Sequence, residues 1–412
     1  MTHFFSPDQS LQAGRWVKLI CGASYQDMPT VRQLVMFYAL AGVDCVDVAA
    51  DPAVVTAARQ GLKDAATLAL TLGNRHHLLP GLPWLMVSLN DSDDPHFRKA
   101  YFDATRCPAT CDRPCEAVCP TAAIQFQGAG RGGVVREFCY GCGRCLPLCP
   151  IGAIEAQPHR ANPEAFPVDR LADIDAVEIH TQVGRQGEFA QLWQRLQPWR
   201  CHLKLISISC PDDDQIVSYL RDIYAIIAPL DIPVIWQTDG RPMSGDLGRG
   251  TTHAAIRLAQ KVLGANLPGY IQLAGGTNAY TVSKLLELGL VKVSPTPPPG
   301  LLQLQGQPGS LSPNLGQTIS GIAYGSYART LLQPLLVAVD QKLGDWPRRA
   351  GSSEGQSSAG LATQYGTDPS GSATALTLVA DNGRSSLLEE GIQRARSLVG
   401  QLKMEVPNGD HA

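Results

Sequence analysis

The sequence lacks a strong charge of either sign. Its 34 lysines and arginines nearly balance its 37 aspartates and glutamates, so the formal net charge is −3 at pH 7. Proteins that bind the phosphate backbone of nucleic acids usually carry a basic patch or an excess of basic residues. This composition therefore gives no indication of a nucleic-acid partner.

Long hydrophobic runs are also missing, although 44% of the residues are hydrophobic. No apolar stretch approaches the roughly 18 residues that a membrane-spanning helix requires. Residues 1–14 do not show the basic and then apolar pattern of a secretory signal. We therefore expect no membrane span, a cytoplasmic location, and a loose leader over residues 1–14.

Familiar catalytic and nucleotide-binding signatures are absent. The glycine-rich segment 239–250 matches neither the P-loop nor the dinucleotide-binding fingerprint, so we interpret it as a plain loop. His76 and His77 have no companion ligands at a useful spacing. We find no nucleophile paired with a base and no pair of carboxylates. The sequence thus predicts no catalytic residue, and an enzyme is the less favoured interpretation.

Cysteine, in contrast, is concentrated in one stretch, because eight of the 12 cysteines lie between Cys107 and Pro150. Residues 139–150 read C-x2-C-x2-C-x3-C-P, the run by which bacterial ferredoxins bind a [4Fe–4S] cluster. Residues 107–120 have the looser spacing x3, x3, x3 and end in the same Cys-Pro. These near-repeats predict a ferredoxin-like insert over residues 99–160 that holds two [4Fe–4S] clusters.

The spacing also predicts which cysteines share a cluster. In ferredoxin runs the first three cysteines bind one cluster, and the fourth binds the other. The predicted ligand sets are Cys139, Cys142, Cys145 and Cys119 for one cluster, and Cys107, Cys111, Cys115 and Cys149 for the other.

Two other interpretations of the cysteines fit less well. Four-cysteine zinc sites usually consist of C-x2-C pairs separated by a spacer, whereas these runs place four cysteines together before a proline. Disulfides are typical of secreted chains, and no secretory signal is evident here.

Around this stretch, short apolar runs alternate with amphipathic segments, as expected for a parallel sheet. The expected strands are residues 16–21, 43–49, 84–89, 176–181, 203–209, 232–238, 270–274 and 318–324. Eight such units in about 250 residues predict a (β/α)8 barrel, and an open doubly wound sheet is the alternative. The insert divides the barrel into residues 15–98 and 161–343.

The C-terminal part has a different composition. Residues 344–384 are rich in glycine, serine and alanine, which predicts a flexible linker. Residues 385–403 carry apolar residues at helical spacing and predict an amphipathic helix that docks on the main body or on a partner. Residues 404–412 are expected to be a frayed tail.

Strand ends are the expected position of functional groups in a barrel. The residues there are Cys21, Asp47, Asn90, His180, Gln182, Cys210, Gln237, Asp239, Gly275, Gly276, Asn278, Gly325 and Ser326. Gly275–Gly276 and Gly325–Ser326 follow the last two strands, where barrels often bind phosphate, so a phosphate or flavin ligand is one interpretation. Tight strand-to-helix turns also favour glycine, and this plainer interpretation is preferred.

Several segments resemble the light-dependent period (LdpA) family of cyanobacteria. They are residues 14–27, 41–51 and 271–278 and the two ferredoxin-like runs, and the resemblance extends from about residue 11 to residue 343. It implies an iron–sulfur protein that reports the redox state of the cell, and hence light, to the circadian clock and modulates its period. It also implies complexes with clock input and output proteins of the KaiA, CikA and SasA type, and no known reaction.

The leading hypothesis is therefore a redox-sensing regulatory protein, in which a change of cluster charge alters the docking of a clock partner. Arg113, Arg136 and Arg144 lie near the cysteines in sequence and are expected to stabilise reduced clusters. The alternative is a barrel oxidoreductase whose insert delivers electrons to a flavin or substrate at the barrel mouth. An electron donor or acceptor is expected as a further partner of the clusters.

Overall fold

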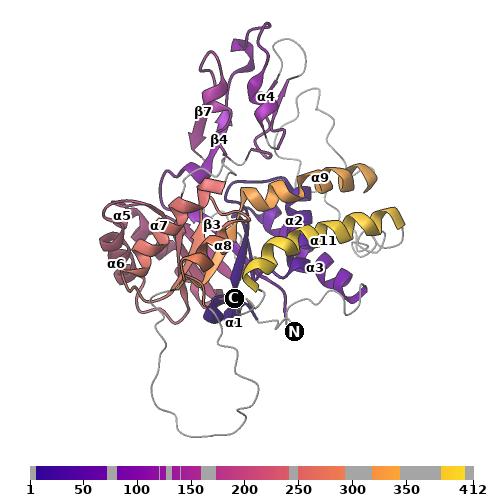
Figure 1. Cartoon of the computed structure of the whole chain (residues 1–412). Coiled ribbons are helices and arrows are strands. Elements are labelled where there is room, and N and C mark those ends of the chain that lie inside the picture. The colour runs from indigo at the N-terminus through magenta and orange to yellow at the C-terminus, as the bar shows by residue number, and fades with distance from the viewer. Residues whose placement is uncertain are drawn as a thin grey trace, which may run out of the picture.

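A closed barrel of eight parallel strands forms the body of the molecule (Figure 1). The computed structural model of the chain describes residues 6–71, 81–119, 121–126, 132–139, 141–158, 173–240, 249–292, 318–343 and 382–403. In barrel order the strands are β1 (Trp16–Gly22), β12 (Gly321–Tyr324), β11 (Tyr270–Ala274), β10 (Val234–Asp239), β9 (Leu205–Pro211), β8 (Ala176–His180), β3 (Trp84–Asn90) and β2 (Cys45–Ala49). The predicted (β/α)8-type barrel is confirmed, and the open sheet is wrong.

Helices surround the barrel and follow the strands in sequence. They are α2 (Met28–Ala41), α3 (Pro52–Thr71), α5 (Gln186–Arg195), α6 (Ile216–Ile227), α7 (Thr252–Leu263), α8 (Thr281–Glu287) and α9 (Ser326–Leu343), with short 3₁₀ turns η7 (Gln197–His202) and η8 (Arg249–Thr251). In α6, residues Ile216, Tyr219, Leu220, Ile223 and Ile227 are buried. This i, i+3, i+4, i+7 pattern is what places one apolar face on the sheet.

Alternation along the strands separates two cores. In β1, Val17 and Leu19 join the large core between the strands and the helices. Trp16 belongs to the second core, which is small and fills one end of the barrel interior. Its other buried members are Leu11, Cys45, Met86, Ala176, Leu205 and Ile235.

Helix α1 (Pro7–Ala13) closes the N-terminal end of the barrel, at the bottom of Figure 1. Leu11 is buried with Trp16, and the Ser6 N–H donates to Gln9 Oε1 at 3.0 Å. The prediction of a loose leader over residues 1–14 is therefore wrong for residues 7–13. The signal that reveals this helix is the capping box Ser6-x-x-Gln9.

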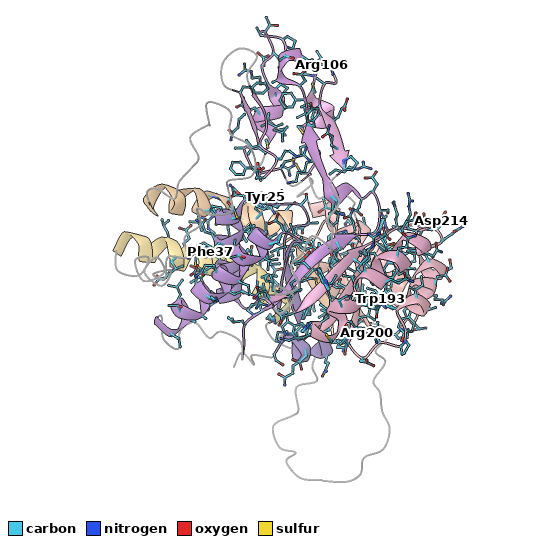
Figure 2. The ribbon with its side chains drawn as sticks, turned by 180° about the vertical axis from the view of Figure 1, so that it is seen from behind. Tyr25, Phe37, Arg106, Trp193, Arg200 and Asp214 are labelled. Atoms are coloured by element: carbon cyan, nitrogen blue, oxygen red, sulfur yellow. The ribbon has the colours of Figure 1, made fainter. Side chains whose placement is uncertain are left out.

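Helix α11 (Asn382–Lys403) lies along α2 and α9 on one side of the barrel (Figure 1). Gly391 approaches the buried Phe37 ring so closely that an added Cβ would lie 2.3 Å from Phe37 Cε1 (Figure 2 labels Phe37). Lys403 pairs with buried Asp44 at 2.5 Å, and Arg15 donates to the Leu402 carbonyl at 2.9 Å. The chain thus uses this helix as part of its own body.

Two C-terminal predictions fall largely outside the described residues. Of the expected linker 344–384, only residues 382–384 are described, and they belong to α11. The expected tail 404–412 lies entirely outside the described residues.

The cysteine-rich insert follows β3 and stands beyond the C-terminal ends of the barrel strands (Figure 1). Its elements are η2 (Pro95–Phe97), β4 (Arg98–Tyr101), η3 (Ala104–Arg106), α4 (Pro114–Val118), β5 (Ile124–Phe126), β6 (Gly132–Val134), η4 (Leu146–Leu148) and β7 (Glu155–Pro158). Strand β4 pairs with β7 and β5 with β6, both antiparallel. Figure 2 shows Tyr25 where the insert meets the barrel and Arg106 near its far end.

Among the described residues, none of the helices combines the length and the apolar character that crossing a membrane requires.

Candidate iron–sulfur site

Four cysteines from two parts of the insert line one cavity of about 150 Å³. Cys139, Cys142 and Cys145 come from the compact ferredoxin-type run, and Cys119 follows α4. Burial, and after it the nearby thiols of Cys142, Cys139 and Cys119, together raise the pKa of the Cys145 thiol to about 12. Four thiols that face one space in this way form a soft donor set for a metal centre.

The other four cysteines gather at a second position. Burial raises the pKa of the Cys107 thiol, and the neighbouring thiols of Cys111 and Cys149 add to this effect. Cys115 responds in the same way to burial and then to Cys149 and Cys107. Cys119 thus lines a cavity with the second run, and Cys149 lies close enough to Cys107 and Cys115 to act on their thiols. The division of the eight cysteines between two clusters stays a prediction.

Backbone N–H groups point at sulfur atoms in both groups. Ala123 N donates to Cys119 Sγ at 3.2 Å, and Ala153 N donates to Cys149 Sγ at the same distance. Ala100 N donates to Cys139 Sγ at 3.3 Å. Hydrogen bonds to sulfur are one way in which proteins adjust the potential of iron–sulfur clusters. The matching pair at Cys119 and Cys149 shows the pseudo-symmetry that the sequence repeat predicts.

The residues present fit an iron–sulfur cluster better than a zinc ion. The thiols come as two sets of four, and aliphatic side chains such as Ile124 and Ile154 are buried beside them. A dry shell of this kind, with N–H donors on sulfur, is the environment that tunes a cluster. When bound, such a cluster supplies a centre that accepts or releases one electron at a time.

The three arginines singled out from the sequence lie in different surroundings. Arg144 lines the cavity of Cys119 and Cys139. The Arg113 guanidinium lies 4.2 Å from the centre of the Phe126 ring, and its backbone N–H donates to Cys111 Sγ at 3.4 Å. The backbone carbonyl of Arg136 accepts a hydrogen bond from Lys99, and its exposed side chain donates to Gln157.

Lys99 is a cation at this site that the sequence did not reveal. It lies on β4, lines the cysteine cavity and is 1% exposed. Its ammonium donates to Gln26 Oε1 at 2.6 Å and to the Arg136 carbonyl at 2.7 Å. Burial lowers the pKa of Lys99 to about 8. A charge placed in the cavity therefore has a buried, partly desolvated amine beside it.

The same lysine joins the insert to the barrel. Gln26 lies in the connection between β1 and α2, and its side-chain amide donates to Asp51 Oδ2 at 3.0 Å. Its backbone N–H donates to the Glu137 carbonyl at 3.0 Å. Ser24 adds a hydrogen bond to the His96 carbonyl at 3.2 Å. The β1–α2 connection is thus hydrogen-bonded to the insert at three points.

A polar network fills the middle of the barrel interior. Lys18 is fully buried and forms an ion pair with Glu178, which also accepts from Ser207 at 2.9 Å and Gln237 at 2.7 Å. Gln272 donates in turn to Gln237 at 2.5 Å. Burial alone would raise the pKa of Glu178, but the charge of Lys18 and the hydrogen bond from His180 hold it well below its usual range.

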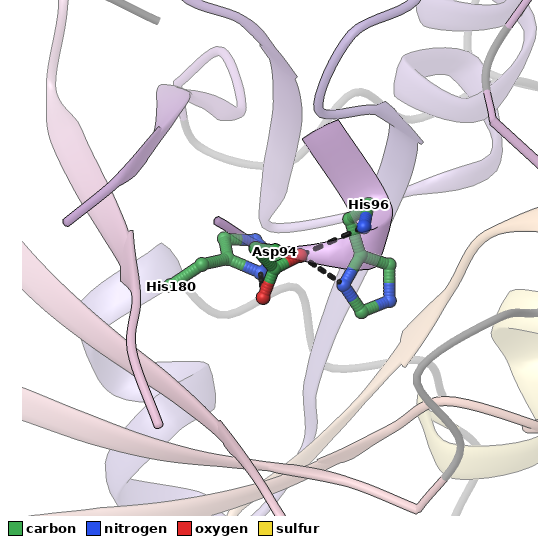
Figure 3. Close-up of side chains that lie close together, drawn as sticks. All are labelled: Asp94, His96 and His180. Atoms are coloured by element: carbon green, nitrogen blue, oxygen red, sulfur yellow. Dashed lines mark hydrogen bonds and ion pairs between the residues drawn. The ribbon is translucent and has the colours of Figure 1, made fainter. Parts of the chain in front are cut away.

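Two histidines and a carboxylate lie above this network, where the insert leaves the barrel (Figure 3). Asp94 Oδ1 is 2.9 Å from His96 Nδ1, and His180 Nε2 is 3.1 Å from Glu178 Oε1. Burial lowers the pKa of His180, but Glu178, Asp94 and Asp239 outweigh it and raise the pKa to about 9. The mouth of the barrel is therefore a region of closely coupled charges.

Comparison with known proteins identifies the family of this chain. It is 53% identical over 332 residues to light dependent period A of Synechococcus elongatus, an alignment that covers 80% of this chain and 84% of that protein. The family model for the light dependent period A C-terminal domain matches residues 170–401, and that for the LdpA Fe-S cluster-binding domain matches residues 107–160. The chain belongs to the LdpA family.

Shorter matches connect this LdpA-family chain to other iron–sulfur proteins. An iron-sulfur protein of Rhodospirillum rubrum is 41% identical over 56 residues, and the electron transport protein HydN of Escherichia coli is 44% identical over 52 residues. Each match covers 13% of this chain and 29% of the relative. Together with the cysteine geometry, they support an iron–sulfur cofactor in the family.

The glycine turns of this LdpA-family barrel show why glycine is needed there. Gly276 has φ +106°, and an added Cβ would lie 2.6 Å from the Thr251 carbonyl oxygen. Helix α8 begins only at Thr281, so Gly275 and Gly276 do not lead directly into it. Gly325 and Ser326 do lead into α9. Close backbone packing accounts for Gly276, and a phosphate or flavin at these turns stays a prediction.

Other expected positions have mixed outcomes. His76, His77 and residues 241–248 lie outside the described residues. Cys21, Cys45 and Cys210 are buried in strands, as expected of structural cysteines, whereas Cys201 is exposed.

Sequence reasoning missed Lys18, Glu178, Asp94 and His96. The available signal was a charged residue in the middle of an apolar strand, as in Trp-Val-Lys18-Leu-Ile and Ala-Val-Glu178-Ile-His. Such a residue at an inward position needs a buried partner.

Proposed function

We propose that this LdpA-family chain is an iron–sulfur redox sensor, located in the cytoplasm, that conveys the light-dependent redox state of the cell to the circadian clock and so modulates its period. Its relative in Synechococcus elongatus carries the name light dependent period A, and the Fe-S cluster-binding family model matches residues 107–160. The observation that carries the proposal is the gathering of eight cysteines into two sets of four within one insert.

Two [4Fe–4S] clusters are part of this proposal. One is assigned to Cys139, Cys142, Cys145 and Cys119, and the other to Cys107, Cys111, Cys115 and Cys149. The shared cavity of the first set and the electrostatic proximity of the second support this division. Short spacing within ferredoxin-type inserts allows electrons to pass between two such centres.

A route for the signal runs through Lys99. Lys99 lines the cavity, and its ammonium donates to Gln26, whose amide in turn donates to Asp51 at the start of α3. A change of charge in the cavity would act first on the hydrogen bonds of this buried amine, because electrostatic interactions are stronger in a low-dielectric interior than in water. The β1–α2 connection is then the barrel surface where a docking partner would detect the change.

The partners proposed are clock input and output proteins of the KaiA, CikA and SasA type. A sensor of this kind must present different surfaces in its two states, because a partner can shift a conformational equilibrium only by its difference in affinity. An electron donor or acceptor is a further partner that any redox-active cluster requires.

An oxidoreductase is the second candidate, favoured by one observation. Asp94, His96 and His180 form a charged group at the barrel mouth, below the insert that would supply electrons. The barrel interior argues for the sensor, because Lys18, Glu178 and Gln272 hydrogen-bond one another or their neighbours and fill the space. A purified protein that carries flavin would decide for the enzyme.

The test is an anaerobic redox titration of the full chain followed by EPR. Wild type is expected to show two [4Fe–4S] signals with potentials inside the working range of the cell. Cys142→Ser should lose one signal, and Cys201→Ser, which alters an exposed cysteine outside the insert, should keep both. Clusters that stay in one state throughout that range would refute redox sensing.

A second measurement separates sensing from mere electron carriage. Binding of a KaiA-type protein to the oxidised and reduced forms is compared by calorimetry under anaerobic conditions. We expect the two affinities to differ by about fivefold or more, because this is the lower end of typical allosteric coupling. Equal affinities for the two forms would leave the protein a carrier of electrons but no sensor.

A further inference from the structure

Three metal-ligating side chains meet at the barrel mouth, outside the two cysteine groups. Asp94 and His96 follow β3 at the entry to the insert, and His180 ends β8. The strands β3 and β8 are paired, with Asn90 opposite His180, so the fold brings the three residues together although the insert separates His96 from His180 in the sequence. One ligand atom from each lies within 4.8 Å of those of the other two (Figure 3).

The orientation of His180 is the most informative feature. Its Nε2 is 3.1 Å from Glu178 Oε1, and its Nδ1 faces Asp94 Oδ2 at 3.9 Å, beyond hydrogen-bond distance. Histidines that bind metal ions almost always donate their outer N–H to a carboxylate, a carbonyl or a water. Glu178 occupies that outer position, so Nδ1, which faces Asp94, is the nitrogen that would bind an ion in place of its proton.

The spacing suits a single small ion. Two ligand atoms about 2.1 Å from an ion lie at most about 4.2 Å apart, so the 3.9 Å between His180 Nδ1 and Asp94 Oδ2 is compatible with a shared ion. The three ligand atoms lie within 4.8 Å of one another, so binding one ion requires them to move closer together. His96 is hydrogen-bonded to Asp94 at 2.9 Å, a contact that metal binding would replace.

The local charge also favours a cation. Asp94 and Glu178 flank His180, and Asp239 at the end of β10 acts electrostatically on both His96 and His180. Three carboxylates around two imidazoles leave net negative charge when the imidazoles are neutral. The Lys18 ammonium pairs with Glu178 and neutralises its charge. The excess negative charge therefore remains on the side of the site that faces His96.

We propose that Asp94, His96 and His180 bind one divalent first-row transition-metal ion, and that Glu178 positions His180 for it. Two imidazoles and one carboxylate are ligands that suit zinc and ferrous iron. Three protein ligands leave a coordination position for water or a small anionic or carbonyl ligand, as in catalytic metal sites. The site lies at the C-terminal ends of the strands, where barrels place their chemistry. It does not depend on redox sensing by the cysteine clusters.

The test uses Zn²⁺ as the probe and the full chain with its clusters intact under anaerobic conditions. The protein is treated with a chelator, desalted, given one equivalent of Zn²⁺ and desalted again. Retained zinc is measured by mass spectrometry, and its ligands are identified by zinc-edge X-ray absorption. Wild type is expected to retain one zinc with nitrogen and oxygen neighbours at about 2.0–2.1 Å.

Variants identify the ligands. His96→Ala is expected to lower zinc affinity at least tenfold, whereas His202→Ala, which changes an exposed histidine elsewhere, should match wild type. Glu178→Gln should weaken binding by about 10- to 100-fold, as loss of a partner of a ligand does. If buried His180 proves necessary for folding, His96→Ala still decides, because His96 lies outside the barrel strands.

Two results would overturn the proposal. One is zinc retention by His96→Ala equal to that of wild type. The other is sulfur neighbours at about 2.3 Å, which would place the zinc on cysteines instead. Either result would leave the three side chains as an ion-pair group without a metal, and neither would bear on the redox behaviour of the clusters.

Discussion

The barrel and the insert are stabilised in different ways. The barrel buries a continuous apolar layer between strands and helices and satisfies its interior polar groups with one another. Among the described residues of the insert, the core consists of nine buried residues, three of which are cysteines. Its two sheets have two strands each. A two-stranded sheet is marginal by itself in water, so the insert must rely on its metal centres.

This difference separates stability from responsiveness. A region whose fold depends on a bound metal centre can change its conformation when the charge of that centre changes. A closed barrel with a large core resists such a change of conformation. Local stability within one chain commonly varies in this way, and functional segments are drawn from the less stable end. The predictions below test that contrast, from the largest expected effect to the smallest.

Loss of a cluster ligand should unfold the insert and spare the barrel. In Cys145→Ser we expect amides of residues 98–158 to exchange with solvent roughly 100-fold faster or more, because a structural metal centre contributes folding free energy directly. Barrel amides should change little. Hydrogen exchange followed by mass spectrometry measures both regions, with Cys201→Ser as the control. Equal loosening of the barrel strands would contradict the contrast.

Breaking the buried ion pair should destabilise the barrel instead. Lys18→Met leaves the Glu178 carboxylate buried without its partner, which typically costs about 3–5 kcal/mol. The double variant Lys18→Met/Glu178→Gln removes the unpaired charge and should lose less. Urea unfolding followed by the fluorescence of buried Trp16 and Trp236 gives the free energies. A double variant less stable than Lys18→Met would argue against this account.

The pH dependence of the barrel should expose Asp47. Burial raises the pKa of Asp47 to about 7 against the opposing charge of Lys18, while Glu178 raises it and Ser88 and His180 lower it. The unfolded carboxyl titrates near about pH 4, so the folded state binds more protons between these values. The contribution of Asp47 to the free energy of unfolding therefore falls as pH rises from about 4 to 7.

Asp47→Asn should remove this contribution. Between pH 5 and 7 the variant is expected to lose about 2 kcal/mol less stability than wild type, since each pH unit corresponds to about 1.4 kcal/mol. Unfolding curves of wild type and Asp47→Asn at the two pH values give the four free energies of unfolding that are compared. Parallel pH profiles for the two proteins would show that Asp47 is already ionised when folded.

The contact between α11 and α2 should be sensitive to a single methyl group. Gly391→Ala adds a Cβ against the Phe37 ring and should cost about 1 kcal/mol, although alanine normally favours a helix over glycine by about that amount. Gln393→Ala, at an exposed position of the same helix, serves as the control. Thermal unfolding of the full chain compares them, and a more stable Gly391→Ala would mean that the helix lies further from α2.

The barrel could be predicted because its signals are local and repeated. Apolar runs of strand length recur between amphipathic segments, and β11 begins and ends where the sequence pattern places it. The eight cysteines were equally clear, because ligand spacing along one loop is a property of the sequence. Helix α1 was missed because Leu11 alone provides its apolar contact with the barrel interior.

The barrel mouth could not be predicted for a different reason. Asp94 and His180 lie on either side of the insert, and only the pairing of β3 with β8 brings them together. Before the strand order is known, a lone histidine at a strand end gives no indication of which acid it faces. Lys18 and Glu178 could not be paired from the sequence for the same reason, since β1 and β8 face each other only once the barrel has closed with β2 and β3 between them.

The pairing of β3 with β8 has a consequence for protein engineering. Because these neighbouring strands bond directly to each other, closure of the sheet needs no hydrogen bond from the segment spliced between them. That segment also begins and ends on paired strands, with Arg98 opposite Pro158. A chain in which a short glycine-serine bridge joins β3 to β8 is therefore expected to keep its barrel closed, since the pairing of these two strands does not involve the insert.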